Sequence, residues 1–205
     1  MAVYPLLTDV VEGPPQGQWN YEDWEQLPYD GKRYEVIDGN LYVSMYGSDP
    51  ETVVHQEIVK RFYVIVGLPA EQQGLAVAYF APIGLNIPGL AALRPDFVLV
   101  LTEHATIVNR RDIWGIPDLV AEVLSPATSE YDQGKKLTTY ATGGVPEYVI
   151  LDPEQRQLRL YTLKAPGEYG EPHVFNEGDT ATFACLPTIG VEVSSLFAGA
   201  PDTTV

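Results

Sequence analysis

The chain has 205 residues, of which 45% are hydrophobic and 20% charged, the composition of one globular domain with a full-sized core. Its formal net charge of −16 argues against strong non-specific binding to nucleic acid, because phosphate contacts normally come from Lys and Arg. Cys185 is the only cysteine, which excludes an intrachain disulfide and a cysteine-based zinc cluster and suits a reducing cytoplasm.

The acidic charge lies mainly at the two ends of the chain. Residues 1–31 and 165–205 hold six acidic residues each and no Lys or Arg, whereas the region between them has 16 acids against 12 bases. Eight of those bases form adjacent pairs, which are usually solvated surface: Lys32-Arg33, Lys60-Arg61, Arg110-Arg111 and Lys135-Lys136. We expect an N-terminal extension over 1–19, a single domain over 20–198 and a tail over 199–205, without a signal peptide.

The first part of the chain predicts a short helix, a hairpin and a longer helix. The short helix is expected over 21–26, and the hairpin over 33–44, because Asp38-Gly39 supplies the positive φ angles of a tight turn. Apolar residues at helical spacing then predict a helix from about 51 to 66.

The middle of the chain predicts the strands of a sheet. The uncharged stretch 74–93 is near the length of a membrane span, but its prolines, glycines and alternation favour strands, which we place at 75–88. Further strands are expected at 95–101 and 118–124, the second ended by Ser125-Pro126.

A helix and two more strands are expected after that point. The helix begins near Thr128, with Thr128 or Ser129 as its cap, and ends at Gly143-Gly144. Strands at 145–151 and 157–162 follow, so that the fold class is a mixed α/β sheet with few helices.

Two acidic residues belong to apolar runs that predict buried strands. Asp96 precedes Phe97-Val98-Leu99-Val100, and Glu122 lies within Leu119-Val120-Ala121-Glu122-Val123-Leu124. A buried carboxylate costs several kcal/mol unless it is paired or coordinates a metal. For one such residue an Arg partner or backbone amides would suffice, but two of them followed by a lysine-bearing helix favour a metal.

That helix carries Asp132, Lys136 and Tyr140 at i, i+4 and i+8, so all three share one stripe. Asp96 and Glu122 would then hold Mg²⁺, for which Mn²⁺ could substitute, while Lys136 orients a water or stabilises developing charge during phosphodiester hydrolysis. The alternative is a solvated Asp132–Lys136 pair worth about 0.2–0.5 kcal/mol.

Taken together, these motifs resemble the Uma-type (Uma-two) family, labelled putative restriction endonucleases, a branch of the PD-(D/E)xK nuclease superfamily. The resemblance covers about residues 20–165. It is carried by Tyr34-Glu35-Val36-Ile37-Asp38-Gly39, His55, Arg94-Pro95-Asp96, Glu122-Val123-Leu124-Ser125-Pro126, Asp132-x-x-x-Lys136, Tyr140, Gly144-Val145-Pro146-Glu147-Tyr148 and Asp152-Pro153.

The resemblance implies a restriction-endonuclease-like fold, with a mixed central sheet flanked by helices, and metal-dependent cleavage of DNA. It assigns metal binding to Asp96, Glu122 and the backbone carbonyl of Val123. The superfamily's lysine usually lies two residues after the acid, where this chain has Leu124, and the family moves that function to Lys136.

The resemblance also assigns supporting residues. Glu35 would complete the metal site or bind a second ion, with a pairing to Arg33 or Lys32 as the equal alternative. His55 faces the site or acts as a surface or cap residue, and Asp132 positions Lys136. Lys135 is a neighbour that could substitute for Lys136, and Tyr140 is expected to pack in the core with a wet hydroxyl.

The hypothesis is therefore a cytoplasmic, Mg²⁺-dependent endonuclease whose partner is DNA, bound weakly and in a salt-sensitive way, without a membrane. A homodimer is a guess, because two cuts in a duplex are often made by a symmetric pair and the apolar 74–93 segment could supply an interface. Two alternatives stay open: an inactive nuclease-fold module that binds nucleic acid or a protein, and a glycosidase with paired carboxylates, which leaves Lys136 unexplained.

Overall fold

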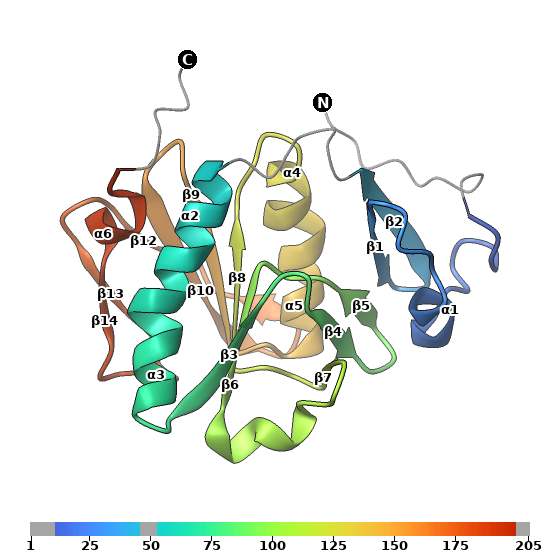
Figure 1. The fold of residues 1–205 in the computed structure, drawn as a ribbon, viewed down its shortest axis with the longest axis horizontal. Helices are drawn as coiled ribbons and strands as arrows, with labels where there is room; N and C mark the ends of the chain where they lie inside the picture. The colour runs from blue at the N-terminus through green and yellow to red at the C-terminus, as the bar shows by residue number, and fades with distance from the viewer. Residues whose placement is uncertain (1–10, 46–52, 200–205) are drawn as a thin grey trace.

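The structure, a computed structural model, describes residues 11–45 and 53–199 and has a mixed α/β architecture, as the sequence predicts (Figure 1). Its helical segments are α1 (Tyr21–Glu25), α2 (Val53–Phe62), α3 (Leu68–Gln72), a 3₁₀ segment (Thr102–Ile107), α4 (Ser129–Tyr131), α5 (Leu137–Gly143) and α6 (Val193–Phe197). Wide π-helical turns join α2 to α3 (Tyr63–Gly67) and α4 to α5 (Asp132–Lys136).

The strands form two larger sheets and one small one. A five-stranded sheet has the order β2 (Asn40–Met45), β1 (Lys32–Ile37), β5 (Ala91–Leu93), β4 (Gly84–Ile87) and β7 (Asp112–Trp114). A seven-stranded sheet has the order β11 (Glu168–Tyr169), β10 (Gln157–Ala165), β9 (Glu147–Asp152), β8 (Leu119–Val123), β6 (Phe97–Leu101) and β3 (Ala76–Phe80), with β12 (His173–Phe175) beside β10. The third sheet pairs β13 (Thr180–Thr182) with β14 (Gly190–Glu192).

The larger sheet is buried on both faces, which explains its continuous apolar strands. Within β6, Phe97 and Leu99 pack in the core beneath α2 and α3, while Val98 and Val100 pack on the opposite face. Figure 1 shows α2 and α3 against one side of this sheet and the helix α4–α5 between it and the hairpin β1–β2. Neighbouring residues on one strand therefore enter different cores.

The hairpin prediction is confirmed. Asp38 and Gly39 have φ angles of 49° and 72°, as a two-residue turn requires, and β1 pairs antiparallel with β2 on either side of them. The prediction of a helix ending near residue 66 is wrong at its end, because the helical path continues to Gln72. Pro69 falls in the first turn of α3, where its missing N–H is tolerated, and the wide turn at 63–67 precedes it. The predicted start at 51 lies outside the described residues.

The strands predicted over 75–88 are present, but they do not join the same sheet. This segment forms two strands that belong to different sheets, β3 paired with β6 and β4 paired with β5 and β7. Pro82 lies between them, and proline cannot donate to a strand ladder. The strands expected at 95–101 and 118–124 are present as β6 and β8.

The helix predicted from Thr128 is present, but the side chain of Thr128 forms no capping hydrogen bond. Instead, the N–H of Ser129 donates to the carbonyl of Ser125 at 2.9 Å, so a backbone bond begins the helix. Gly144 ends it in the left-handed conformation (φ 85°), as predicted. The strands expected at 145–151 and 157–162 correspond to β9 and β10.

The sequence did not predict the short elements β5, β7, β11 to β14 and α6. Each strand among them has only two or three residues, too few to show a clear alternation. Among the described residues, no helix is long and apolar enough to cross a membrane, and the 74–93 segment forms strands.

One crossing of the chain positions the residues discussed next. The chain leaves the five-stranded sheet at the end of β5 and enters the seven-stranded sheet at the start of β6, with Arg94-Pro95-Asp96 between the two. Because β1 pairs with β5 and β8 with β6, charged residues on β1, β8 and this link lie close together.

Candidate active site

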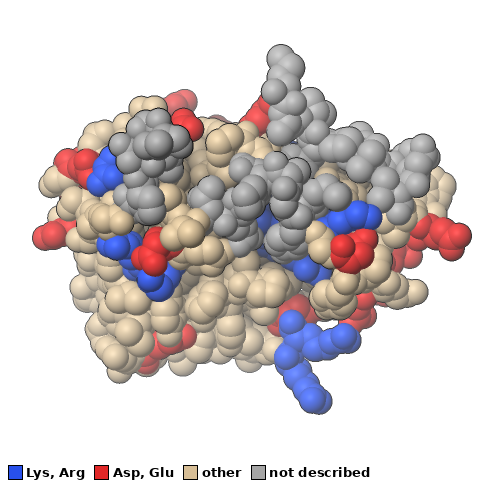
Figure 2. Space-filling view, turned by 45° about the horizontal axis from the view of Figure 1, so that its top comes forward, with Lys and Arg blue, Asp and Glu red and all other residues tan. Residues whose placement is uncertain are grey.

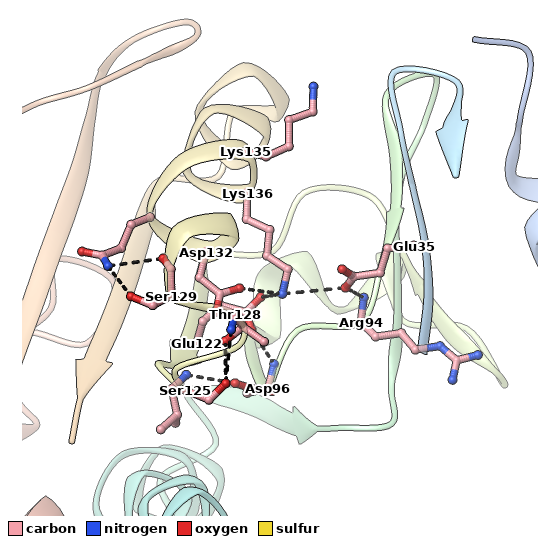
Figure 3. A network of polar contacts seen from close by, with 12 residues as sticks. Glu35, Arg94, Asp96, Glu122, Ser125, Thr128, Ser129, Asp132, Lys135 and Lys136 are labelled. Atoms are coloured by element: carbon pink, nitrogen blue, oxygen red, sulfur yellow. Dashed lines mark hydrogen bonds and ion pairs between the residues drawn. The ribbon is translucent and has the colours of Figure 1, made fainter. Parts of the chain in front are cut away.

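A buried cluster of charged residues lies where the two sheets meet (Figure 3). Strand β1 contributes two of its members, the link before β6 one, strand β8 one, helix α2 one and the helix α4–α5 three. In chain order they are Arg33, Glu35, His55, Asp96, Glu122, Asp132, Lys136 and Tyr140. The structure therefore brings together seven of the residues that the sequence analysis selected, and adds Arg33.

Glu122 is at the centre of the cluster and is 1% exposed. Its neighbours Ala121 and Val123 pack in the core beneath α2, so strand alternation turns Glu122 towards the helix α4–α5. There Oε1 accepts hydrogen bonds from Lys136 Nζ at 2.8 Å and from the hydroxyl of Tyr140 at 2.9 Å. Two residues from one helix thus fix a carboxylate on a neighbouring strand.

Asp96 is 3% exposed and is held through one of its two carboxylate oxygens. Oδ2 accepts the backbone N–H of Val123 at 2.9 Å and lies 3.0 Å from Nε2 of His55. Oδ1 forms no hydrogen bond with any residue that the structure describes, and its nearest cation is Arg33 Nη1 at 3.6 Å. His55 therefore faces the site, and Asp96 keeps one oxygen for a further partner.

Lys136 is 2% exposed and is surrounded by carboxylates. Its Nζ lies 2.8 Å from Glu122 Oε1, 3.1 Å from Asp132 Oδ1 and 3.7 Å from Glu35 Oε1. Burial alone would lower the pKa of Lys136, but these carboxylates raise it above its ordinary value. The side chain stays protonated at neutral pH and cannot act as a general base.

Glu35 lies near Lys136 of the site and also near Arg33, the partner that the alternative interpretation gives it. Arg33 Nε is 3.6 Å from its Oε1, while the backbone N–H of Arg94 donates to the same oxygen at 2.8 Å. Burial would raise the pKa of Glu35, but Lys136 and Arg33 lower it below the ordinary value. Lys32 pairs with Asp30 instead, outside the cluster.

Acidic groups outnumber the permanent cations in this cluster. The carboxylates of Glu35, Asp96, Glu122 and Asp132 face the two permanent cations Lys136 and Arg33. Burial, opposed by Lys136 but reinforced by the carboxylates of Asp96 and Asp132, raises the pKa of Glu122 to about 8. Burial acts in the same direction on Asp96, but His55 and Arg33 outweigh it, so the pKa of Asp96 lies well below its usual range.

The raised pKa of Glu122 predicts how stability depends on pH without metal. Between pH 4.5 and about 8 the folded protein keeps a proton that the unfolded chain releases. This contribution to the free energy of unfolding is fully present below pH 4.5 and is lost as pH rises towards 8, with a slope of at most about 1.4 kcal/mol per pH unit. We expect Glu122→Gln to remove the part of this pH dependence that comes from Glu122.

Urea denaturation in EDTA at pH 6 and at pH 9, on wild type and Glu122→Gln, measures this effect. The variant should gain stability relative to wild type at pH 9. An equal pH dependence in the two proteins would show that Glu122 does not hold this proton.

The donor set fits a magnesium ion. Among residues 11–45 and 53–199, no group of three or more His, Cys, Asp or Glu side chains is arranged to hold a metal ion. Magnesium, however, is commonly held by only one or two carboxylates together with waters and substrate phosphates. Asp96 and Glu122 supply such a pair, and Oδ1 of Asp96 has no hydrogen-bond partner among the described residues, which leaves it open to a cation.

Two expectations about individual residues are wrong. Lys135 lies outside the cluster, because its Nζ bonds Asp38 Oδ2 at 2.8 Å on the surface, and Figure 3 shows it pointing away from Lys136. The hydroxyl of Tyr140 is buried against Glu122 rather than wet, since Tyr140 is 0% exposed.

Sequence reasoning missed Arg33 as a member of the cluster. It was counted with Lys32 as an adjacent basic pair and named as an alternative partner of Glu35, but its contacts with Asp96 and Glu122 were not expected, although alternation along β1 places Arg33 and Glu35 on one face. That shared face was the signal that could have found it. Leu124 is buried in the apolar core that also contains Tyr131 and Tyr140.

Comparisons with known proteins identify the family and the fold of this chain. Residues 21–194 match the family model Uma2, described as "Putative restriction endonuclease". A crystal structure from Anabaena variabilis ATCC 29413, described as "a putative nuclease belonging to DUF820", matches with a TM-score of 0.70 and 17% identity, covering 86% of this chain and 96% of that chain. No curated protein matches. The likeness in structure confirms the restriction-endonuclease-like fold.

Proposed function

Because this chain belongs to the Uma2 family, we propose that it is a metal-dependent nuclease that hydrolyses phosphodiester bonds in DNA. The observation that carries the proposal is the contact between Lys136 and Glu122, 2.8 Å long and fully buried. It joins two residues 14 positions apart and supplies a lysine where the strand itself has Leu124. A carboxylate pair beside a protonated lysine is what phosphodiester hydrolysis needs.

Asp96 and Glu122 are the side chains that would hold Mg²⁺ or Mn²⁺, with the backbone carbonyl of Val123 as the third ligand that the family resemblance implies. When bound, the ion supplies charge for a phosphoryl oxygen and lowers the pKa of water. Glu35, buried with its Oε1 3.7 Å from Lys136 Nζ, is the acid that the family resemblance implies for completing the site or binding a second ion.

The chain's own residues hold this arrangement in place. Asp132 keeps Lys136 directed at the carboxylates from one turn away, and Tyr140 fixes the orientation of Glu122. His55 and the N–H of Val123 do the same for Asp96. Since Lys136 stays protonated, we assign it to stabilising the charge that develops on the phosphate rather than to taking a proton.

The test is cleavage of supercoiled plasmid and of short single strands by metal-stripped protein, with Mg²⁺ or Mn²⁺ added back. We expect cleavage with either ion and none in excess EDTA, and expect cleavage to return when Mg²⁺ exceeds the chelator. Cleavage that continues in EDTA would remove the metal from the proposal. Cleavage that Glu122→Ala retains in full would point to a contaminating nuclease.

Binding to DNA is expected to be weak and sensitive to salt. On the face shown in Figure 2, basic and acidic side chains are interspersed rather than gathered into a broad basic surface. A chain with a net charge of −16 gains little from phosphate contacts, and screening should weaken them further. That two copies of the chain form a dimer with a groove for DNA stays a prediction. Sedimentation of the protein with and without DNA would test it.

A second candidate is a module of the same fold that binds nucleic acid or a protein without cutting. The observation that favours it is the closure of the cluster, in which Lys136 and Glu122 are at most 2% exposed. A folded protein that binds Mn²⁺ and DNA but cuts neither plasmid nor single strands would support this candidate over the nuclease.

A further inference from the structure

Arg33 has an unusual environment for an arginine beside three carboxylates. Its Nε lies 3.6 Å from Glu35 Oε1, its Nη1 3.6 Å from Asp96 Oδ1 and its Nη2 3.9 Å from Glu122 Oε2. Each nitrogen faces a different acid, so the guanidinium lies in the centre of the three. Its positive charge is therefore shared among the three acids instead of being paired with one of them.

The contacts of Arg33 are too long to be hydrogen bonds. Charge-assisted bonds between arginine and carboxylate normally measure about 2.7–2.9 Å and are often bidentate. Among the described residues, Arg33 Nε and Nη2 are buried without a hydrogen-bond partner, and so is Asp96 Oδ1. Lys136, by contrast, donates a hydrogen bond of 2.8 Å to Glu122.

The two cations also face different oxygens of Glu122. Lys136 and Tyr140 bond Oε1, whereas Oε2 faces Arg33. Asp96 divides its oxygens in the same way, with Oδ2 bonded to His55 and Oδ1 facing Arg33. Among the described residues, Asp96 Oδ1 has no hydrogen bond and Glu122 Oε2 accepts only the backbone N–H of Asp96, at 3.3 Å, and these are the two oxygens that Arg33 faces.

Arg33 is also the cation of the cluster nearest to solvent. Its side chain is 13% exposed, against 2% for Lys136. Movement outwards would therefore cost Arg33 fewer contacts than it would cost Lys136.

We propose that Arg33 is the counter-cation of the metal-free site and competes with the divalent ion for Asp96 Oδ1 and Glu122 Oε2. The proposal rests on the proposed function for the identity of the ion, but it concerns binding rather than cleavage. When the ion is bound, the guanidinium of Arg33 would no longer face these two oxygens. Arg33 thereby sets the affinity of the site for its metal.

Calorimetric titration of Mn²⁺ into the metal-stripped, full-length protein tests this competition. We expect Arg33→Gln to bind Mn²⁺ at least about tenfold more tightly than wild type, because one positive charge is removed a few ångströms from the ion. The matched control is Lys32→Gln, the same change of charge one residue away, where the side chain pairs with Asp30. It should change the affinity by less than about twofold, since the charge of Lys32 lies outside the cluster, is already paired with Asp30 and is screened more than a buried charge.

Equal or weaker Mn²⁺ binding by Arg33→Gln would overturn the proposal, as would the absence of Mn²⁺ binding by every protein tested. Competition without any DNA cleavage would leave the proposal standing and would count against the nuclease instead. The two ideas can therefore fail separately.

A measurement on wild type guards against misfolding of the variant. Arg33 should react with the arginine-specific reagent phenylglyoxal several times faster at saturating Mn²⁺ than in EDTA, with sites assigned by mass spectrometry. The exposed Arg110 provides the internal reference, whose rate should not change. An unchanged rate at Arg33 would show that the ion does not displace it.

Discussion

Replacement of Lys136 by methionine is expected to slow plasmid cleavage by at least about a hundredfold, the usual cost of removing one donor that stabilises transition-state charge. Methionine keeps most of the volume of the side chain but leaves Glu122 and Asp132 without their cation. Removing one partner of a buried ion pair also costs about 3–5 kcal/mol of stability, so the variant should unfold at lower urea. Cleavage is therefore measured at low temperature on protein shown to be folded by circular dichroism.

The control for this prediction is the adjacent residue. Lys135→Met makes the same chemical change, but Lys135 bonds Asp38 on the surface and lies outside the cluster. We expect it to retain wild-type cleavage and stability, because exposed ion pairs contribute at most about 1 kcal/mol. If folded Lys136→Met cuts as fast as Lys135→Met, the lysine function does not belong to Lys136.

Asp96→Asn is expected to abolish detectable Mn²⁺ binding and to slow cleavage by about a hundredfold or more, since an amide is a poor substitute for a carboxylate on a divalent ion. The effect should appear in calorimetry as well as in the cleavage rate. The fold should survive, because an amide oxygen can still accept the N–H of Val123 and bond His55.

Asp118→Asn provides a matched control for that variant. Asp118 is also a buried acid next to β6 and β8, but its partners are His104 and the N–H of Leu101, outside the cluster. We expect Mn²⁺ binding and cleavage close to wild type in Asp118→Asn. Loss of Mn²⁺ binding and of cleavage in Asp118→Asn as well as in Asp96→Asn would indicate general disruption of the sheet rather than a site at Asp96.

The strongest local signals in the sequence predicted their elements correctly. Asp38-Gly39 gave the hairpin turn, and the apolar runs around Asp96 and Glu122 gave two buried strands. The predictions failed where the sequence pattern continued unchanged while the chain moved from one sheet to another. Alternation continues across Pro82, yet the strands on either side of it belong to different sheets.

The charged cluster shows the same limit. Spacing along one helix placed Asp132, Lys136 and Tyr140 together, because helical neighbours are fixed by local geometry. Spacing could not place Arg33 between Glu35 and Asp96, since that contact depends on how the β1–β5 sheet meets the β6–β8 sheet. Burial of the Tyr140 hydroxyl depends on the same long-range arrangement.

The wide turn of helix α4–α5 brings one extra residue into the site without redirecting the helix that follows it. This turn spans Asp132–Lys136, and such a turn holds one residue more than a regular helical turn. A chain one residue shorter here would form a more regular helix and would leave Tyr140 facing Glu122 much as it does now, because the extra residue is absorbed within the turn. The spacing that would change is the one between Asp132 and Lys136, so the lysine of the site depends on the irregular turn whereas its tyrosine does not.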